Sequence, residues 1–188
     1  PISEEEIVFV CVANHGILKG THKLLKIWKE KKIKNRLLII GKIYTEMKPY
    51  IKEIENLKNI EILESMTREK IAEVYKKNKC MGVLMSVSES YGRTVYECLC
   101  TSTPVLVTPT CTCDLVEDGI NGYVVSSYEE EAIYQKLSTI ISMDKETYVK
   151  MSEAVYQTIH RKKDKFEKSY TDALLNASKL GRYQKTNK

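Results

Sequence analysis

The chain has 188 residues, which is enough for a domain with a sizeable buried core. Its 43% hydrophobic and 29% charged residues are ordinary globular composition, and no apolar run reaches the roughly 18 residues that a membrane-spanning helix needs. The net charge of +5 comes mainly from lysines on amphipathic stretches, which indicates solvated helix faces, with a polyanionic partner or peripheral contact with an anionic membrane as the alternative.

Short apolar runs rich in branched residues predict β-strands. They lie at residues 7–12, 37–40, 60–63, 81–85 and 104–107. Continuous apolar runs, as opposed to alternating ones, are typical of parallel strands covered on both faces. A turn at residues 117–122 then precedes a last short strand at 123–125.

Stretches with helical spacing lie between these runs. Three of them follow Thr21, Thr45 and Thr67, and a threonine at such a position predicts an N-cap. From residue 127 onward the pattern is entirely helical, and its later parts are expected to be helices at 145–161 and 165–180, then a frayed polar tail at 181–188.

Alternating strands and helices predict an α/β fold with a doubly wound, Rossmann-like parallel sheet and extra C-terminal helices. No internal repeat or linker rich in Pro, Gly or Ser interrupts the pattern. We therefore expect one domain over residues 1–180.

Six cysteines do not have the spacing of a metal site or a disulfide framework. Two C-x-C pairs occur without any C-x-x-C. We expect reduced thiols in a cytoplasmic protein, with no bound metal.

Ligands of doubly wound sheets bind at the carboxyl ends of the strands, near a topological switch point. After the first strand, Lys19 stands beside a glycine and could neutralise a phosphate, with Asn14 in the same loop. Taken alone, Lys19 is better explained as a surface lysine before a helix, and Asn14 as a loop residue. Gly41 ends the second strand and would let a flat ligand such as a base approach closely, or would simply make a turn.

The segment after the fourth strand is the most informative in the chain. Glu89 and Glu97 stand eight positions apart on either side of a glycine turn. Gly92 and Arg93 fall in the first turn of the next helix, where free N–H groups and the helix dipole favour an anion. As separate residues the two glutamates would be surface side chains. Around this turn they predict a site for a phosphorylated sugar.

The loop after the fifth strand, residues 108–114, carries small hydroxyl residues. Thr110 and its neighbours could complete an anion pocket. Asp114 is better explained as the N-cap of the short helix that follows.

Together these segments resemble the C-terminal, donor-binding half of the GT-B glycosyltransferases, specifically the retaining group 1 (family 4) enzymes. The resemblance covers residues 6–180. Its parts occur in the family's order, namely Lys19-Gly20, the run that ends at Gly41, Ser88 through Glu97, Thr103-Pro104-Val105 and the segment 117–122.

This resemblance implies roles for particular residues. Glu89 would hold hydroxyls of the donor sugar and face the reacting anomeric centre, Glu97 would bind the ribose, and Lys19 would neutralise the leaving diphosphate. The residues whose backbone N–H groups would hold sugar hydroxyls and phosphate are Tyr91, Gly92, Arg93 and Thr94.

Three features depart from the family pattern. An arginine common a few residues before the lysine is missing, and Asn14 is nearby instead. Residues 111–113 replace a glycine pair, a change that is expected to alter sugar selection. The usually alanine-rich motif helix carries Cys98-Leu99-Cys100, a packing variation.

The implied function is retaining transfer of a hexosyl group from a nucleotide-diphosphate sugar to a glycan or lipid-linked acceptor, in polysaccharide or cell-envelope glycan synthesis. UDP-hexose is the first candidate donor and GDP-mannose the second, with no metal or other cofactor required. The enzyme would act in the cytoplasm, at the inner face of the membrane.

A GT-B enzyme also needs an N-terminal acceptor domain, which this chain does not supply. Because the chain begins at Pro1, we expect an excised fragment. Without the acceptor domain, this fragment is expected to bind its donor weakly and to transfer little. The alternative is a non-catalytic module of the same fold that serves a partner protein. Binding to nucleic acid is disfavoured, because the basic residues are not interleaved with clustered aromatic ones.

Overall fold

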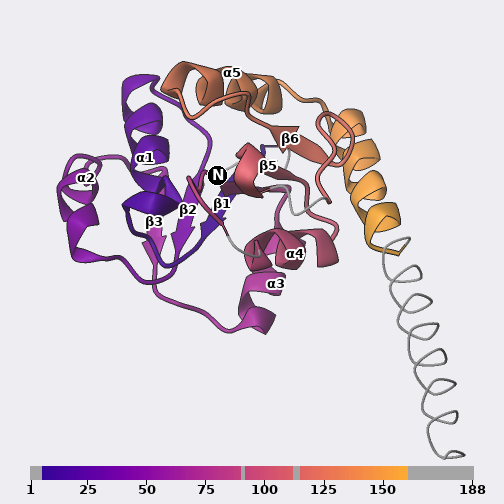
Figure 1. The fold of residues 1–188 in the computed structure, drawn as a ribbon, viewed down its shortest axis with the longest axis horizontal. Helices are drawn as coiled ribbons and strands as arrows, with labels where there is room; N and C mark the ends of the chain where they lie inside the picture. The colour runs from indigo at the N-terminus through magenta and orange to yellow at the C-terminus, as the bar shows by residue number, and fades with distance from the viewer. Residues whose placement is uncertain (1–5, 90–91, 112–114, 161–188) are drawn as a thin grey trace, which may run out of the picture. The chain divides into compact units, whose positions relative to one another are not determined.

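The computed structural model describes residues 6–89, 92–111 and 115–160 (Figure 1). The chain divides into two compact units, Pro1–Tyr156 and Gln157–Lys188. The first unit contains the sheet and its helices. The predicted helix at 165–180 and tail at 181–188 lie outside the described residues.

A six-stranded, fully parallel sheet forms the centre of the first unit, in the order β3-β2-β1-β4-β5-β6. The strands are β1 (Val8–Val12), β2 (Leu37–Ile40), β3 (Ile60–Leu63), β4 (Cys80–Leu84), β5 (Val105–Val107) and β6 (Gly122–Val124). Each lies within one residue, at either end, of its predicted apolar run, so the predicted doubly wound α/β fold is confirmed.

Helices cover both faces of this sheet. On one face lie α1 (Thr21–Glu30), α2 (Lys48–Lys52) and α5 (Glu130–Ile141), and on the other lie α3 (Arg68–Lys77) and α4 (Arg93–Cys100) (Figure 1). The connections include the short 3-10 helices η1 (Ile17–Lys19), η2 (Thr45–Met47) and η3 (Pro109–Cys111). Residues 145–160 are helical as predicted.

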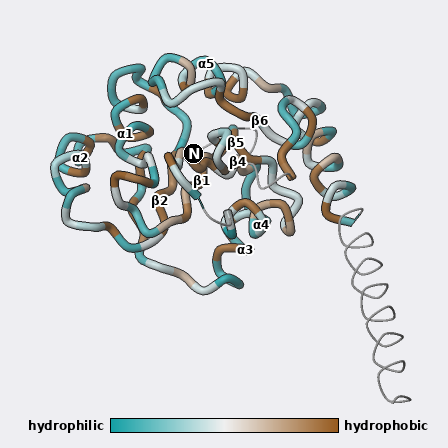
Figure 2. Tube along the Cα trace, in the orientation of Figure 1, coloured by the Kyte–Doolittle hydropathy of each residue, from teal (hydrophilic) through white to brown (hydrophobic). Residues whose placement is uncertain are grey.

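The core lies between the sheet and these helices, and Figure 2 shows the apolar segments on the strands and on the inner sides of the helices. Phe9 of β1 packs edge-on against Trp28 of α1, with 5.2 Å between ring centroids. The indole Nε1 of Trp28 donates to Asn35 O at 3.0 Å, so the polar atom of this buried ring is satisfied.

Two of the three predicted threonine caps are wrong. Gly20 is the N-cap of α1, and Thr21 is its first residue, with a buried hydroxyl that lies 2.8 Å from His15 Nδ1. Tyr44 precedes η2, so Thr45 lies inside that helix. The cap at Thr67 is confirmed, because its Oγ1 accepts a hydrogen bond from the α3 backbone at 3.4 Å.

Within the described part of the chain, none of the helices has the length and apolar character needed to cross a bilayer.

Candidate functional site

The strand order reverses between β1 and β4, which makes the carboxyl ends of these two strands the switch point of the sheet. The loop after β1 leads to η1 and α1, and the segment after β4 leads to α4. A ligand at this edge would therefore contact both segments.

Close backbone contacts fix the spacing of these two segments. Gly20 has φ 69°, and a Cβ placed on it would lie 2.0 Å from Met85 O, so a glycine is needed there. Next to it, Val87 N donates to Leu18 O at 2.9 Å. The loop after β1 is thus held against the start of the segment after β4.

Lys19 and Glu89 meet across this junction, although they are 70 positions apart in the sequence. Lys19 Nζ lies 2.6 Å from Glu89 Oε2, and the side chains are 31% and 18% exposed. Ser86 Oγ donates to the same carboxylate oxygen at 3.4 Å. The two residues predicted to be catalytic form one ion pair at the switch point, beside the carboxyl ends of β1 and β4.

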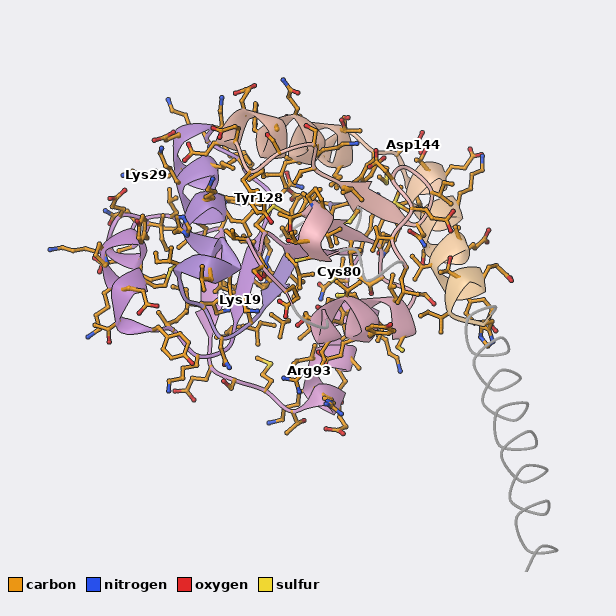
Figure 3. All side chains as sticks on the ribbon, in the orientation of Figure 1. Lys19, Lys29, Cys80, Arg93, Tyr128 and Asp144 are labelled. Carbon is orange, nitrogen blue, oxygen red and sulfur yellow. The ribbon has the colours of Figure 1, made fainter. Side chains whose placement is uncertain are left out.

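Five of the predicted site residues line a single cavity at this edge: Asn14, Lys19, Glu89, Arg93 and Thr94. Figure 3 shows Lys19 on the loop after β1 and Arg93 at the start of α4. The sequence therefore identified much of one continuous pocket, while the strand residues that complete it, such as Cys11 and Leu84, carried no chemical signal.

The first turn of α4 points its backbone N–H groups toward the carboxyl edge of the sheet. Gly92 is the N-cap with φ 51°, and Arg93 is the first helical residue. The first N–H groups of a helix have no partner within that helix, and together with the helix dipole they attract anions. Thr94 Oγ1 donates to Val12 O at 3.3 Å, which ties α4 to the end of β1. Tyr91, predicted to lie in the same turn, is outside the described residues.

Glu97 lies further along α4 than the residues of the cavity. Its Oε1 is 3.5 Å from Nε of Arg68, the first residue of α3, and the Arg68 side chain is 75% exposed. Since exposed ion pairs are weak, this contact leaves the carboxylate available to a ligand.

Gly41 lines a separate, shallower hollow at the ends of β2 and β3, together with Lys42, Ile43 and residues 62–65. Its φ is 134°, and a Cβ placed there would lie 2.0 Å from Ala13 O. The glycine thus allows the ends of β1 and β2 to approach each other, beside a largely apolar hollow.

Thr110 does not belong to the set that lines the Lys19 cavity. Its hydroxyl lies 3.0 Å from Ser86 O and 2.7 Å from the hydroxyl of Tyr128. Asp114, which was predicted to cap the next helix, lies outside the described residues.

His15 connects two segments at the carboxyl edge of the sheet by hydrogen bonds, a role that its sequence position did not indicate. It is fully buried, with Nδ1 2.8 Å from the Thr21 hydroxyl, while Nε2 lies 3.1 Å from Ile40 O. Because a carbonyl can only accept, Nε2 carries the proton and Nδ1 accepts from the threonine. Burial lowers the pKa of His15 from its ordinary value of 6.5, with the bond to Ile40 acting in the opposite direction.

The predicted turn at 117–122 is present, and its polar residues hold β6. Asn121 Nδ2 donates to Leu115 O at 2.8 Å, and its Oδ1 accepts from Glu117 N at 2.8 Å. Asp118 Oδ1 accepts from Val124 N at 2.8 Å. These side chains therefore organise the chain around β6.

Among the described residues, no three His, Cys, Asp or Glu side chains are grouped so that they could hold a metal ion. The cysteines at 11, 80, 98, 100 and 111 are free thiols. Burial raises the pKa of Cys11 to about 12, so this thiol in the cavity wall stays protonated at neutral pH.

The chain matches the family model described as "Glycosyl transferases group 1" over residues 1–158. No curated protein sequence matches it significantly.

Several solved structures are similar in fold. HepE of Anabaena has a TM-score of 0.68 and 17% identity, over 81% of this chain and 43% of that one. The C-terminal domain of the group 1 protein LpcC from Francisella tularensis has 0.69 and 19%, over 82% of this chain and 85% of the domain. A glycosyltransferase from Rickettsia africae has 0.70 and 21%, over 82% and 43%.

These coverages differ in an informative way. The chain spans less than half of the HepE and Rickettsia africae chains but most of the isolated LpcC C-terminal domain. At these identities the likeness establishes the fold.

Proposed function

The chain belongs to the group 1 glycosyltransferases, and on that premise we propose that it is the donor-binding half of a retaining hexosyltransferase. The observation that carries this proposal is the convergence of Lys19, Glu89 and the N-terminus of α4 on one cavity at the switch point. Such an arrangement suits a ligand with a diphosphate next to a sugar.

In this proposal the diphosphate lies between Lys19 and the first turn of α4. The ammonium group and the helix N–H groups would stabilise the negative charge that develops as the diphosphate leaves. The positive groups of the chain supply this charge stabilisation themselves, so the proposal includes no metal ion or other cofactor.

Glu89 changes partner when the donor binds. In the structure it is paired with Lys19 at 2.6 Å. A diphosphate would compete for that lysine, and the freed carboxylate could then accept hydrogen bonds from hydroxyls of the donor sugar. We assign Glu89 to the sugar and its anomeric centre for this reason.

The nucleoside would extend from the diphosphate across the carboxyl edge of the sheet. Glu97 is assigned to the ribose hydroxyls, in exchange for its weak contact with Arg68. The hollow beside Gly41 is assigned to the base, since it has an apolar, open surface at the ends of β2 and β3.

UDP-hexose is the donor we propose first, with GDP-mannose second. HepE has been crystallised with UDP and glucose and with UDP-glucose, which supports this order. The acceptor, a glycan or lipid-linked sugar, would be bound by a separate acceptor domain, since this chain spans 43% of HepE. We place the reaction in the cytoplasm at the membrane surface, where a net charge of +5 would favour contact with anionic lipids.

A thermal-shift panel of UDP, GDP, ADP and their sugars tests this proposal. A ligand at a hundred times its Kd adds about 2.7 kcal/mol to the apparent stability, which raises Tm by roughly 5–10 °C for a domain of this size. We expect such a shift with a uridine or guanosine diphosphate sugar.

Two variants sharpen the panel. Lys19→Ala should remove most of the shift, whereas Lys58→Ala, at an exposed lysine before β3, should leave it unchanged. No shift with any nucleotide, or equal shifts in both variants, would contradict the proposed site.

A further inference from the structure

Three hydroxyl groups converge on the carbonyl oxygen of Ser86, at the start of the segment that carries Glu89. Thr108 Oγ1 lies at 2.7 Å, Thr110 Oγ1 at 3.0 Å and the hydroxyl of Tyr128 at 2.7 Å. Thr108 and Thr110 follow β5, which is the neighbour of β4. Tyr128 comes from elsewhere in the chain, just before α5.

The proton count of this cluster gives Tyr128 a particular place. Each hydroxyl has one proton to donate, and a carbonyl oxygen has two lone pairs. Thr108 can donate to Ser86 O while Thr110 donates to the hydroxyl of Tyr128, at 2.7 Å. Of the three hydroxyls, that of Tyr128 is also placed to donate to the next carbonyl, Val87 O, at 2.9 Å, so its single proton can bond to either carbonyl of this segment.

The residues held by Tyr128 lead directly to the Lys19–Glu89 pair. Ser86 Oγ donates to Glu89, and Val87 N donates to Leu18 O, beside Lys19. Movement of the peptide between residues 86 and 87 would therefore change the distance between the ammonium and carboxylate groups.

Tyr128 also accepts a hydrogen bond from α1, the helix that follows the loop after β1. Lys23 of α1 donates its Nζ hydrogen bond to Tyr128 O at 2.5 Å. Because α1 directly follows the loop that carries Lys19, Tyr128 is hydrogen-bonded to both segments of the site, although it does not line the cavity.

We propose that Tyr128 is a positioning residue, whose hydroxyl sets the geometry of Glu89 relative to Lys19. Its consequence for donor binding rests on the proposed function, but its effect on the segment after β4 does not. Tyr128→Phe removes the hydroxyl and keeps the ring. The matched control is Tyr134→Phe on α5, whose ring lies beneath Lys31 Nζ at 4.6 Å.

The ligand-free test is hydrogen exchange of residues 84–89 in the full chain. Tyr128→Phe should exchange at least threefold faster at the amide of Val87, with an unchanged Tm, and Tyr134→Phe should match the wild type. Unchanged protection in Tyr128→Phe, or faster exchange spread over the whole sheet, would overturn the proposal.

A second arm measures the preference for UDP-glucose over UDP by calorimetry. Tyr128→Phe should reduce that preference three- to tenfold, and Glu89→Gln should abolish it. In the double variant the tyrosine change should have no further effect, because it acts through Glu89. The positioning role would be contradicted if Tyr128→Phe weakened the binding of UDP-glucose and of UDP equally. It would also be contradicted if Tyr128→Phe had its full effect in the Glu89→Gln background.

The two arms separate the two claims. If the wild type binds no nucleotide sugar, including GDP-mannose, and Tyr128→Phe still speeds hydrogen exchange at the Val87 amide, the donor function fails and the positioning role is retained. If the donor binds and exchange is unaffected, the donor function is retained and the positioning role fails.

Discussion

Lys19 and Glu89 form an ion pair, with Nζ 2.6 Å from Oε2. A nucleotide that reaches Lys19 must compete with this carboxylate, which also repels a diphosphate. Under the proposed function, the pair would lower the affinity for the nucleotide and, through Glu89, raise the selectivity for the sugar.

Glu89→Gln should separate these two effects. Loss of the negative charge frees Lys19 and removes repulsion, so UDP should bind about three- to tenfold more tightly, the equivalent of roughly 0.7–1.4 kcal/mol for a partly exposed charge pair. UDP-glucose should lose its advantage over UDP in the same calorimetric titration. Weaker binding of both ligands would show that Glu89 supports the fold of the pocket.

His15 makes stability depend on pH. Its folded-state pKa lies below the ordinary 6.5, since burial disfavours the charged ring. The stability gained from the neutral ring is complete above pH 6.5 and is lost as the pH falls through the lowered value, because the unfolded chain binds the proton first. Protonation would also remove the acceptor that Thr21 uses.

His15→Gln should therefore reduce the loss of stability between pH 7 and pH 5. Urea unfolding at both pH values measures this loss, which is at most about 1.4 kcal/mol per pH unit for one group. His22, whose pKa is also lowered, is present in both proteins and cancels from the comparison. Equal losses in the two proteins would refute this assignment.

The sequence predicted Lys19 and Glu89 because chemistry at the end of a strand can be recognised from local residue order. His15 and Tyr128 could not be found in that way. Their partners, Ile40 and Ser86, are 25 and 42 positions away, and only the packed sheet brings them together.

At the level of the elements, the loop after β1 depends on close packing of a glycine. Gly20 and Gly119 both have a positive φ, 69° and 78°. A Cβ on Gly20 would meet Met85 O, whereas one on Gly119 would meet nothing within 4 Å. An alanine at position 119 would therefore add backbone strain alone, whereas an alanine at position 20 would add both strain and steric overlap.

Gly119→Ala should cost about 1–2 kcal/mol of unfolding free energy, the strain of a left-handed alanine. Gly20→Ala should cost at least about 2 kcal/mol more, because the carbonyl of Met85, directly after β4, must move as well. Urea unfolding of both variants measures the difference. Equal costs would show that the contact between this loop and the segment after β4 is not rigid.

The strands could be predicted because parallel strands covered on both faces need continuous apolar runs. The helix starts were harder. A threonine such as Thr21 can cap a helix or bond to a buried side chain, and the choice depends on His15, which lies in an adjacent loop. Local patterns thus defined the elements better than their ends.

At the scale of the whole molecule, the proposed function gives the chain one half of a reaction site. In that proposal the cavity between the ends of β1 and β4 would supply charge for a diphosphate and a carboxylate for a sugar. The acceptor would then be bound by a further domain, since this chain spans 43% of HepE.

The most direct test of this account is amide NMR of the full chain titrated with UDP-glucose and, separately, GDP-mannose. For one of these ligands, the largest chemical-shift changes should fall on Asn14, Lys19, Arg93 and Thr94, with smaller ones beside Gly41. Changes centred elsewhere, for instance in the pocket that Tyr50 of α2 lines together with residues of α1, or no saturable change with either ligand, would contradict the proposed donor site.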